Sequence, residues 1–172
     1  MTAEATNAAL SQAFADLEFS QFRGQNRVVC PRESVYAVLE MLNKKLSFDF
    51  LAELTCVDYL YYPQAKDRFG LVYVLANTQT NERITVRTFV NDPDPAVPSV
   101  VSLWEAANWL EREVWDLFGI RFEGHPDLRR IVLPEGFAAH PLRKDYPLQG
   151  RGERHNLPVV TRAEGRDAPD AE

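Results

Sequence analysis

The residues best suited to chemistry gather between Trp104 and Leu148, where carboxylates, arginines and histidines alternate with aromatic side chains. The candidate acids are Glu105, Glu111, Glu113 and Asp116, and the histidines are His125 and His140, with His155 shortly after this stretch. Carboxylates and imidazoles are common general acids and bases, and both bind zinc. Metal sites usually start from two ligands on one element, as in HxH or HExxH, and the chain has neither motif. A stand-alone cytosolic, metal-dependent hydrolase is therefore the weaker interpretation of these residues.

Motifs for other kinds of catalysis are absent from the sequence as well. There is no GxxxxGK[ST] or GxGxxG phosphate-binding loop and no GxSxG nucleophile. The two cysteines, Cys30 and Cys56, form no CxxC motif, and an iron–sulfur cluster normally needs four thiolates. We therefore expect no catalytic, cofactor-binding or metal-binding residue in this chain.

One helix is expected to position the acids. An apolar stripe spaced by threes and fours predicts it, formed by Leu103, Ala107, Leu110, Val114 and Leu117. Gly119 follows, and a glycine there can adopt the left-handed cap that ends a helix. Arg112 and Asp116 lie four residues apart, so we expect them to pair on the helix surface. Glu111 shares a face with tryptophans, so that face is expected to be covered, with an arginine as the partner of Glu111.

The segment after this helix, residues 121–150, is called the arm below. Its four prolines forbid long regular elements, yet it is too apolar for a disordered linker. Residues 121–154 also hold seven basic and five acidic residues, within a chain of net charge −6. Arginine and aromatic side chains dominate binding hot spots between proteins. The arm is therefore expected to lie on its own domain or on an acidic partner surface.

Four short motifs follow one another in this region: ERExxDLFGI from Glu111, GHPxLRRI from Gly124, LPxGF from Leu133 and HPLRKDYPL from His140. Their order resembles the signature of one subunit of respiratory NADH-quinone oxidoreductase (complex I), the subunit lettered C in bacteria. The signature residues are Glu111, Arg112, Glu113, Asp116, Gly119, His125, Pro126, Arg129, Arg130, Pro134, His140, Pro141, Arg143, Lys144, Asp145 and Tyr146.

The resemblance implies a cofactor-free structural subunit in the hydrophilic part of a proton-translocating NADH:quinone oxidoreductase. It implies contacts with subunits D, B and I of that complex, mainly with the one lettered D, which forms the quinone site. FMN, iron–sulfur clusters and quinone would be held by partner subunits. The implied location is the cytoplasmic side of the inner membrane, reached only through the complex. The signature residues would orient the arm and meet the partner.

Two related complexes stay open as alternatives. An equivalent subunit of a membrane-bound hydrogenase, or of a dehydrogenase with another electron donor, would carry the same kind of signature. The electron donor would be chosen by other subunits, so this sequence does not distinguish between these complexes.

The rest of the chain predicts an α+β fold, a mostly antiparallel sheet with helices packed on one face. Apolar or alternating runs at 54–62, 69–76 and 83–90, joined by short loops, predict a meander of three strands. A short strand is expected at 27–30. Helices are expected at 5–18 and from Pro31 to Leu46, with a helical turn at 49–52.

Composition sets the outer limits of these interpretations. With 172 residues, 45% hydrophobic and 26% charged, the chain fits one α+β domain at 1–120, the arm, and a polar, flexible tail at 151–172. The net charge of −6 argues against nucleic-acid binding. No apolar run approaches the roughly 20 residues of a membrane helix, and the first residues lack a secretory signal. We therefore expect a cytosolic chain, or one held at a membrane by partners.

Overall fold

A five-stranded sheet forms the centre of the computed structural model, which describes residues 3–152. The strands are β1 (Glu18–Phe22), β2 (Gln25–Val29), β3 (Phe50–Asp58), β4 (Phe69–Ala76) and β5 (Arg83–Val90), in the spatial order β1-β2-β5-β4-β3. The three long strands form the predicted antiparallel meander. Only β2 runs parallel to its neighbour β5, with Val28 opposite Val86. The mostly antiparallel α+β fold is therefore confirmed.

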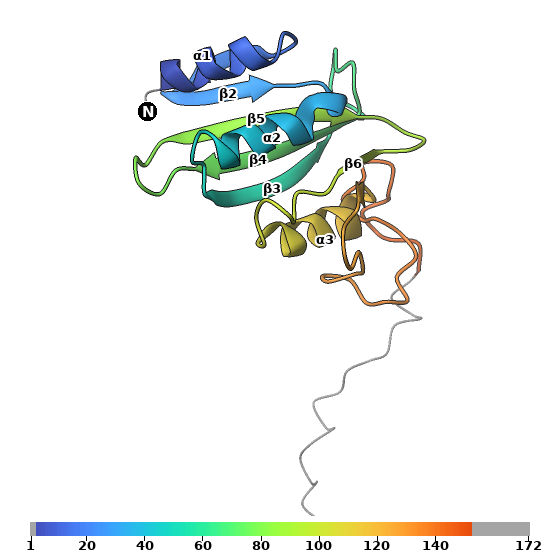
Figure 1. Ribbon diagram of the computed structural model, residues 1–172. Helices are drawn as coiled ribbons and strands as arrows, with labels where there is room; N and C mark the ends of the chain where they lie inside the picture. Colours follow the sequence, from blue (N-terminus) through green and yellow to red (C-terminus); the bar gives the residue numbers. More distant parts are fainter. Residues whose placement is uncertain (1–2, 153–172) are drawn as a thin grey trace, which may run out of the picture.

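Three helices cover one face of this sheet. They are α1 (Ala3–Ala13), α2 (Val35–Lys44), preceded by the 3-10 turn η1 (Arg32–Ser34), and α3 (Ala107–Phe118). In Figure 1, α1 lies beside β2, α2 crosses the middle of the sheet, and α3 lies next to β3. Leu71, Tyr73 and Leu75 of β4 are fully buried in a shared core with Val38 and Leu42 of α2. Among residues 3–152, no helix is long and apolar enough to cross a membrane.

A second, two-stranded sheet was not expected from the sequence. Its strands β6 (Ala96–Pro98) and β7 (Arg121–Glu123) pair in parallel on either side of α3. Three residues are too few to show a strand period, so pattern reasoning could not find them. Because β7 opens the arm, the arm starts already hydrogen-bonded to the chain that precedes α3.

Several predicted elements need correction. The first helix ends at Ala13, and Glu18–Phe22 forms a strand instead. The helical turn at 49–52 is wrong, because β3 starts at Phe50 and an irregular register between Leu51 and Glu53 disturbs its alternation. Helix α3 begins at Ala107, since the residues just before it form turns. The predicted flexible tail lies almost wholly outside the described residues.

Candidate functional site

Helix α3 is the frame on which the signature residues are placed. Gly119 ends it in the left-handed conformation (φ 77°, ψ 20°), as predicted. The buried face matches the predicted apolar stripe only in part: Ala107 and Val114 are buried, while Leu110 and Leu117 are half-buried. The same face includes Glu111, as expected, and also Arg112 and Asp116. Three charged side chains on the inner face of one helix need partners there, because an unpaired buried charge is costly.

Glu111 is fully buried and ties α3 to the chain before it. Its carboxylate accepts hydrogen bonds from the Ser99 hydroxyl and the Val100 N–H, both at 2.7 Å. The expected arginine partner is wrong, since these two groups occupy the carboxylate. Burial raises the pKa of Glu111 to about 7, against the opposing effect of the two hydrogen bonds. Glu111 is thus a candidate for binding a proton near neutral pH, and its hydrogen bonds connect α3 to the preceding segment.

His125 joins the start of the arm to the same helix. Its Nδ1 accepts from the Asp127 N–H at 3.0 Å, which assigns the ring proton to Nε2. Nε2 lies 3.2 Å from the Asn108 carbonyl and 3.9 Å from Glu111 Oε2. The imidazole side chain is fully buried, so it holds the turn of the arm against α3.

Arg112 binds the middle of the arm by its main chain. Its guanidinium donates to the carbonyls of Arg129 and Arg130, both at 3.1 Å, and lies over the Trp109 ring. The predicted pair between Arg112 and Asp116 on the helix surface is therefore wrong. Both side chains point instead to the arm, which lies over this part of α3.

Asp116 holds the next part of the arm. One carboxylate oxygen accepts three successive backbone N–H groups, from Ile131 (3.1 Å), Val132 (2.9 Å) and Leu133 (2.9 Å), and the other pairs with the Arg130 guanidinium. Burial by itself raises the pKa of Asp116, but these donors outweigh it and hold the pKa below its usual range. The carboxylate is therefore charged and fully engaged.

The last carbonyls of α3 are capped by the arm as well. A helix leaves its final carbonyls without partners inside the helix. Here His140 Nδ1 binds the Asp116 carbonyl at 2.9 Å and the Leu142 N–H donates to the Leu117 carbonyl at 3.0 Å. Arg143 donates to the Phe118 carbonyl at 3.4 Å. The arm thus closes the end of the helix that it follows.

The end of the arm reaches back to the main sheet. Arg143 pairs with Asp92 at 2.7 Å, and the Lys144 N–H donates to the Asp58 carboxylate at 2.8 Å. Arg68 pairs with both Asp58 and Asp145, at 3.1 and 2.9 Å. Sequence reasoning missed Asp58, Arg68 and Asp92, and no local pattern marks them, because Lys144 lies 86 residues after Asp58.

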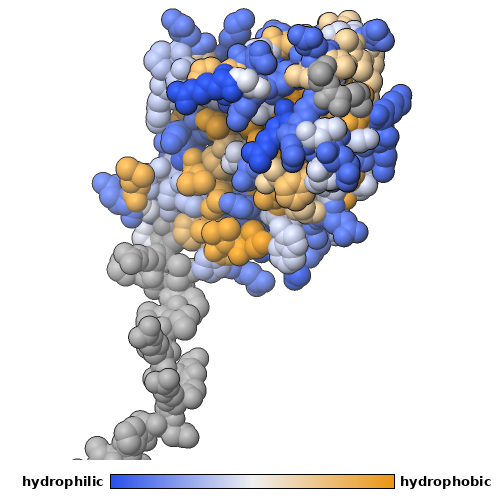
Figure 2. All heavy atoms as spheres, turned by 90° about the vertical axis from the view of Figure 1, so that its left-hand side faces the viewer, coloured by the Kyte–Doolittle hydropathy of each residue, from blue (hydrophilic) through white to orange (hydrophobic). Residues whose placement is uncertain are grey.

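The remaining signature residues lie at or near the surface. Glu113, Pro126, Arg129, Pro134, Lys144 and Asp145 are exposed, while Pro141 and Tyr146 are half-buried. Exposed apolar side chains accompany them on α3 and the arm: Trp109, Ile131, Val132, Leu142 and Leu148. Figure 2 looks at the left-hand side of Figure 1 and shows apolar residues gathered in the lower half of this view, at the height of α3 and the arm in Figure 1. The structure therefore separates signature residues that hold the arm from others that face outward.

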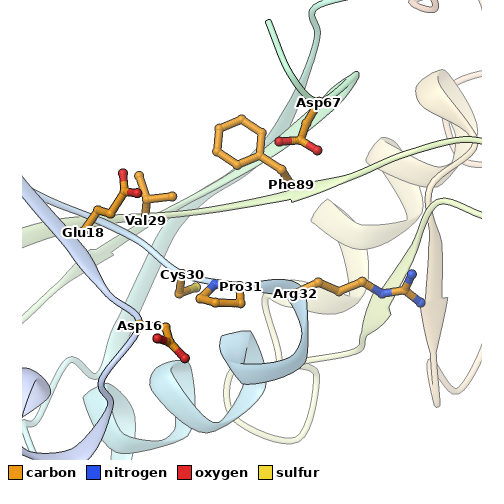
Figure 3. A pocket seen from close by; sticks show the side chains of 8 residues that line it. All are labelled: Asp16, Glu18, Val29, Cys30, Pro31, Arg32, Asp67 and Phe89. Carbon is orange, nitrogen blue, oxygen red and sulfur yellow. The ribbon is translucent and has the colours of Figure 1, made fainter.

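The candidate carboxylates and histidines that the structure describes, which leave out His155, do not assemble into a metal site. Within residues 3–152, no group of three or more His, Cys, Asp or Glu side chains could hold a metal ion. A cavity of about 270 Å³ between β1, β2 and β5 has Asp16, Glu18 and Asp67 in its lining. In Figure 3, Asp16 and Asp67 lie at opposite ends of it and the Arg32 guanidinium points away. The hydrolase interpretation gains no support from this arrangement.

Comparison with known proteins accounts for the signature. The model of the family described as respiratory-chain NADH dehydrogenase, 30 Kd subunit, matches residues 28–152, from β2 through the arm. The chain belongs to this family. In Trichlorobacter lovleyi, the NADH-quinone oxidoreductase subunit lettered C is 47% identical over 136 residues, which are 79% of this chain and 83% of that relative. The NADH-quinone oxidoreductase subunit 5 of Thermus thermophilus is 50% identical over 128 residues, 70% of this chain and 61% of that protein.

Solved structures agree with this assignment to the 30 Kd subunit family. A trypsin-resistant fragment of Nqo5 superposes with a TM-score of 0.65 at 39% identity, covering 73% of this chain and 97% of the fragment. A chain from the structure of the membrane-bound sulfane sulfur reductase, an archaeal respiratory membrane complex, gives a TM-score of 0.69 at 23% identity. It covers 98% of this chain and 95% of that one, and shows that the same fold occurs there.

Proposed function

We propose that the chain is a cofactor-free structural subunit of a proton-translocating NADH:quinone oxidoreductase, and that its arm docks on the quinone-site subunit among its neighbouring subunits D, B and I. One observation carries the proposal: Arg112, Asp116 and His140 bind the arm to α3 and so hold its outer side in a defined shape before any partner arrives. Preorganisation of this kind lowers the entropic cost of binding.

The outer side of the arm has the chemistry of an interface. Ile131 and Val132 bind Asp116 through their main chains, so their side chains are turned outward, with exposed fractions of 39% and 57%. On α3, the Trp109 side chain is 59% exposed. Large apolar side chains gathered on one surface mark sites of protein interaction. In this proposal FMN, iron–sulfur clusters and quinone belong to partner subunits, and the chain reaches the cytoplasmic side of the inner membrane through them.

The names of the relatives favour this complex over an equivalent one with another donor. The relatives from Trichlorobacter lovleyi and Thermus thermophilus carry the name NADH-quinone oxidoreductase, whereas the sulfane sulfur reductase shares the fold alone. The proposal predicts that the tagged full chain, isolated from detergent-solubilised native membranes, brings with it iron–sulfur and quinone-site subunits and NADH:quinone activity. A hydrogenase in the eluate would assign the chain to a complex with another electron donor. A chain isolated alone would overturn the proposal.

A pair of variants tests the arm itself. Val132→Glu places a charge on the outer side of the arm without touching the Asp116 hydrogen bonds, so co-isolation should fall at least tenfold. Ala8→Glu is the matched control, because Ala8 is exposed on α1, at the opposite end of the molecule from the arm (Figure 1). Equal co-isolation of both variants would contradict docking through the arm.

A further inference from the structure

The face of the sheet opposite the helices carries a cluster of three arginines, called here the arginine face: Arg27 on β2 and Arg83 and Arg87 on β5. Residues alternate between the two faces of a strand, and the inward set on β5 includes Ile84 and Val86. Arg27 lies opposite Thr85 in the pairing of β2 with β5. Arg83 and Arg87 lie two residues to either side of Thr85, roughly 7 Å along the strand. The three side chains therefore surround Thr85.

These guanidinium groups have no carboxylate partners. Within residues 3–152, none of the three makes an ion pair; Arg27 lies over the Phe22 ring at 4.7 Å, and Arg87 Nε is buried without a hydrogen-bond partner. Glu18, an acid on β1 that faces the same side, is set apart by the sheet itself. Glu18 lies opposite Val29, and Val29 lies opposite Arg87, so Glu18 is two strands from Arg87, roughly 10 Å.

Basic residues of the arm, in contrast, have carboxylate partners. Arg130 and Arg143 are bound to Asp116 and Asp92, and Arg121 to Asp94. Four basic residues of the arm, Arg121, Arg129, Arg130 and Arg143, are thus paired with carboxylates inside the chain. The arginine face instead holds three arginines that make no ion pair among residues 3–152, in a part of the sheet that no helix covers (Figure 1).

A band of aliphatic side chains runs beside the arginines. On β4, Val72 lies opposite Arg87, Val74 opposite Thr85 and Ala76 opposite Arg83, and all three are half-buried on the open face. A recess of about 680 Å³ opens at the Arg87 end of this face, and its lining includes the rings of Tyr59, Tyr62 and Phe89 together with the acids Glu18 and Asp67. The surface therefore offers positive charge on one side, an aliphatic band on the other, and an aromatic recess at one end.

We propose that the arginine face is a docking surface for an amphipathic, acidic segment of a partner protein. Carboxylates along one side of the segment would pair with Arg27, Arg83 and Arg87, and aliphatic side chains on its other side would lie on the β4 band. This interface is separate from the arm, and the proposal does not depend on the identity of the complex.

The surroundings of the arginines favour a short protein segment over a larger polyanion. Glu18 on β1 and Glu53 on β3, opposite Val74, flank the arginine face on the same side of the sheet. Figure 3 shows Glu18 beside Val29 at this edge. A membrane or a nucleic acid would extend past these acids, and its negative charges would be repelled by them and by a chain of net charge −6. A segment a few residues wide fits between them.

The test uses the full chain in its native complex, with the photo-crosslinker p-benzoylphenylalanine in place of Thr85. Irradiation should give an adduct to a protein segment that has at least two Asp or Glu residues near the crosslinked position. Arg27→Glu with Arg83→Glu should reduce the yield at least fivefold. Replacing acids of the captured segment with lysine should restore it. Salt at about 0.5 M should also lower the crosslinking yield of the chain whose three arginines are unchanged, because it screens the ion pairs.

A control pair keeps the net charge change the same. Lys44→Glu with Lys45→Glu alters two exposed residues at the end of α2, and should leave the yield within twofold of the Thr85 crosslinker chain. An unchanged melting temperature in both pairs would exclude misfolding as the cause. The proposal is overturned by an adduct to lipid or nucleic acid, by no adduct, or by equal losses in both charge-reversed pairs.

Discussion

The imidazole of His140 lies directly against Gly119, the residue that ends α3. A Cβ added to Gly119 would lie 2.7 Å from His140 Cδ2 and 2.9 Å from Nε2. The same imidazole binds the Asp116 carbonyl through Nδ1. Gly119 is therefore needed twice, once for its left-handed backbone and once for the space that His140 occupies. This contact couples the end of the helix to the position of the arm.

Gly119→Ala should destabilise the chain more than the same substitution at a glycine that has a left-handed backbone but open space around it. Gly124 is the matched control, since its φ is 82° and a Cβ there meets nothing within 4 Å. Gly124→Ala should cost roughly 1–2 kcal/mol, and Gly119→Ala about 1–2 kcal/mol more because His140 is displaced. In a His140→Ala background the two substitutions should cost the same. Urea unfolding measures all four free energies, and equal costs in the wild-type background would contradict the contact.

Asp116→Asn should loosen the arm. The substitution removes the charge that Arg130 pairs with and puts an N–H₂ where backbone N–H donors point, which should cost roughly 3 kcal/mol. Glu113→Gln makes the same change on the exposed side of the helix and should stay within about 0.5 kcal/mol of wild type. Amide hydrogen exchange at Ile131–Leu133 should speed up only in Asp116→Asn. Unaltered exchange there would show that the carboxylate does not hold the arm.

Glu111 should make stability depend on pH in an unusual direction. Its pKa is raised to about 7 in the folded chain from 4.5. Between these two values the unfolded chain releases the proton that the folded chain keeps, so stability falls as pH rises, by roughly 3 kcal/mol in total. Glu111→Gln keeps a carbonyl oxygen for the Val100 N–H and should remove this contribution. The difference in unfolding free energy between the two chains should change across pH 4.5–7, and parallel profiles would exclude the assignment.

Arg143 and Lys144 should separate into two roles, although they are adjacent. Arg143→Met removes the pair with Asp92, the bond to the Phe118 carbonyl and the contact over the Phe69 ring, which should cost roughly 1–3 kcal/mol. The Lys144 side chain is exposed, and its hydrogen bond to Asp58 comes from the main chain, so Lys144→Met should unfold like wild type. If both variants lose the same stability, the side-chain contacts assigned to Arg143 do not matter for folding.

Much of the fold could be predicted from local pattern. The run at β4 and the alternation at β5 predicted neighbouring strands because a strand shows its faces every second residue. Gly119 marked the end of α3 because few other residues adopt its backbone conformation. The four motifs were enough for the family resemblance. Elements of three residues, such as β6 and β7, lay below the reach of any periodicity.

The sequence by itself thus determined the three long strands of the meander, the positions of the three helices and the family resemblance, since each follows from neighbours along the chain. The roles of charged residues were decided only by the tertiary structure. Pattern reasoning predicted an arginine partner for Glu111 and a surface pair for Asp116, but both carboxylates are buried because residues 11 to 17 positions away supply their hydrogen bonds. A count of charges indicated a basic arm, while folding neutralised Arg143 and left Arg27 and Arg87 unpaired. Whether a charge finds its partner depends on distances across the fold, and these distances are set by packing.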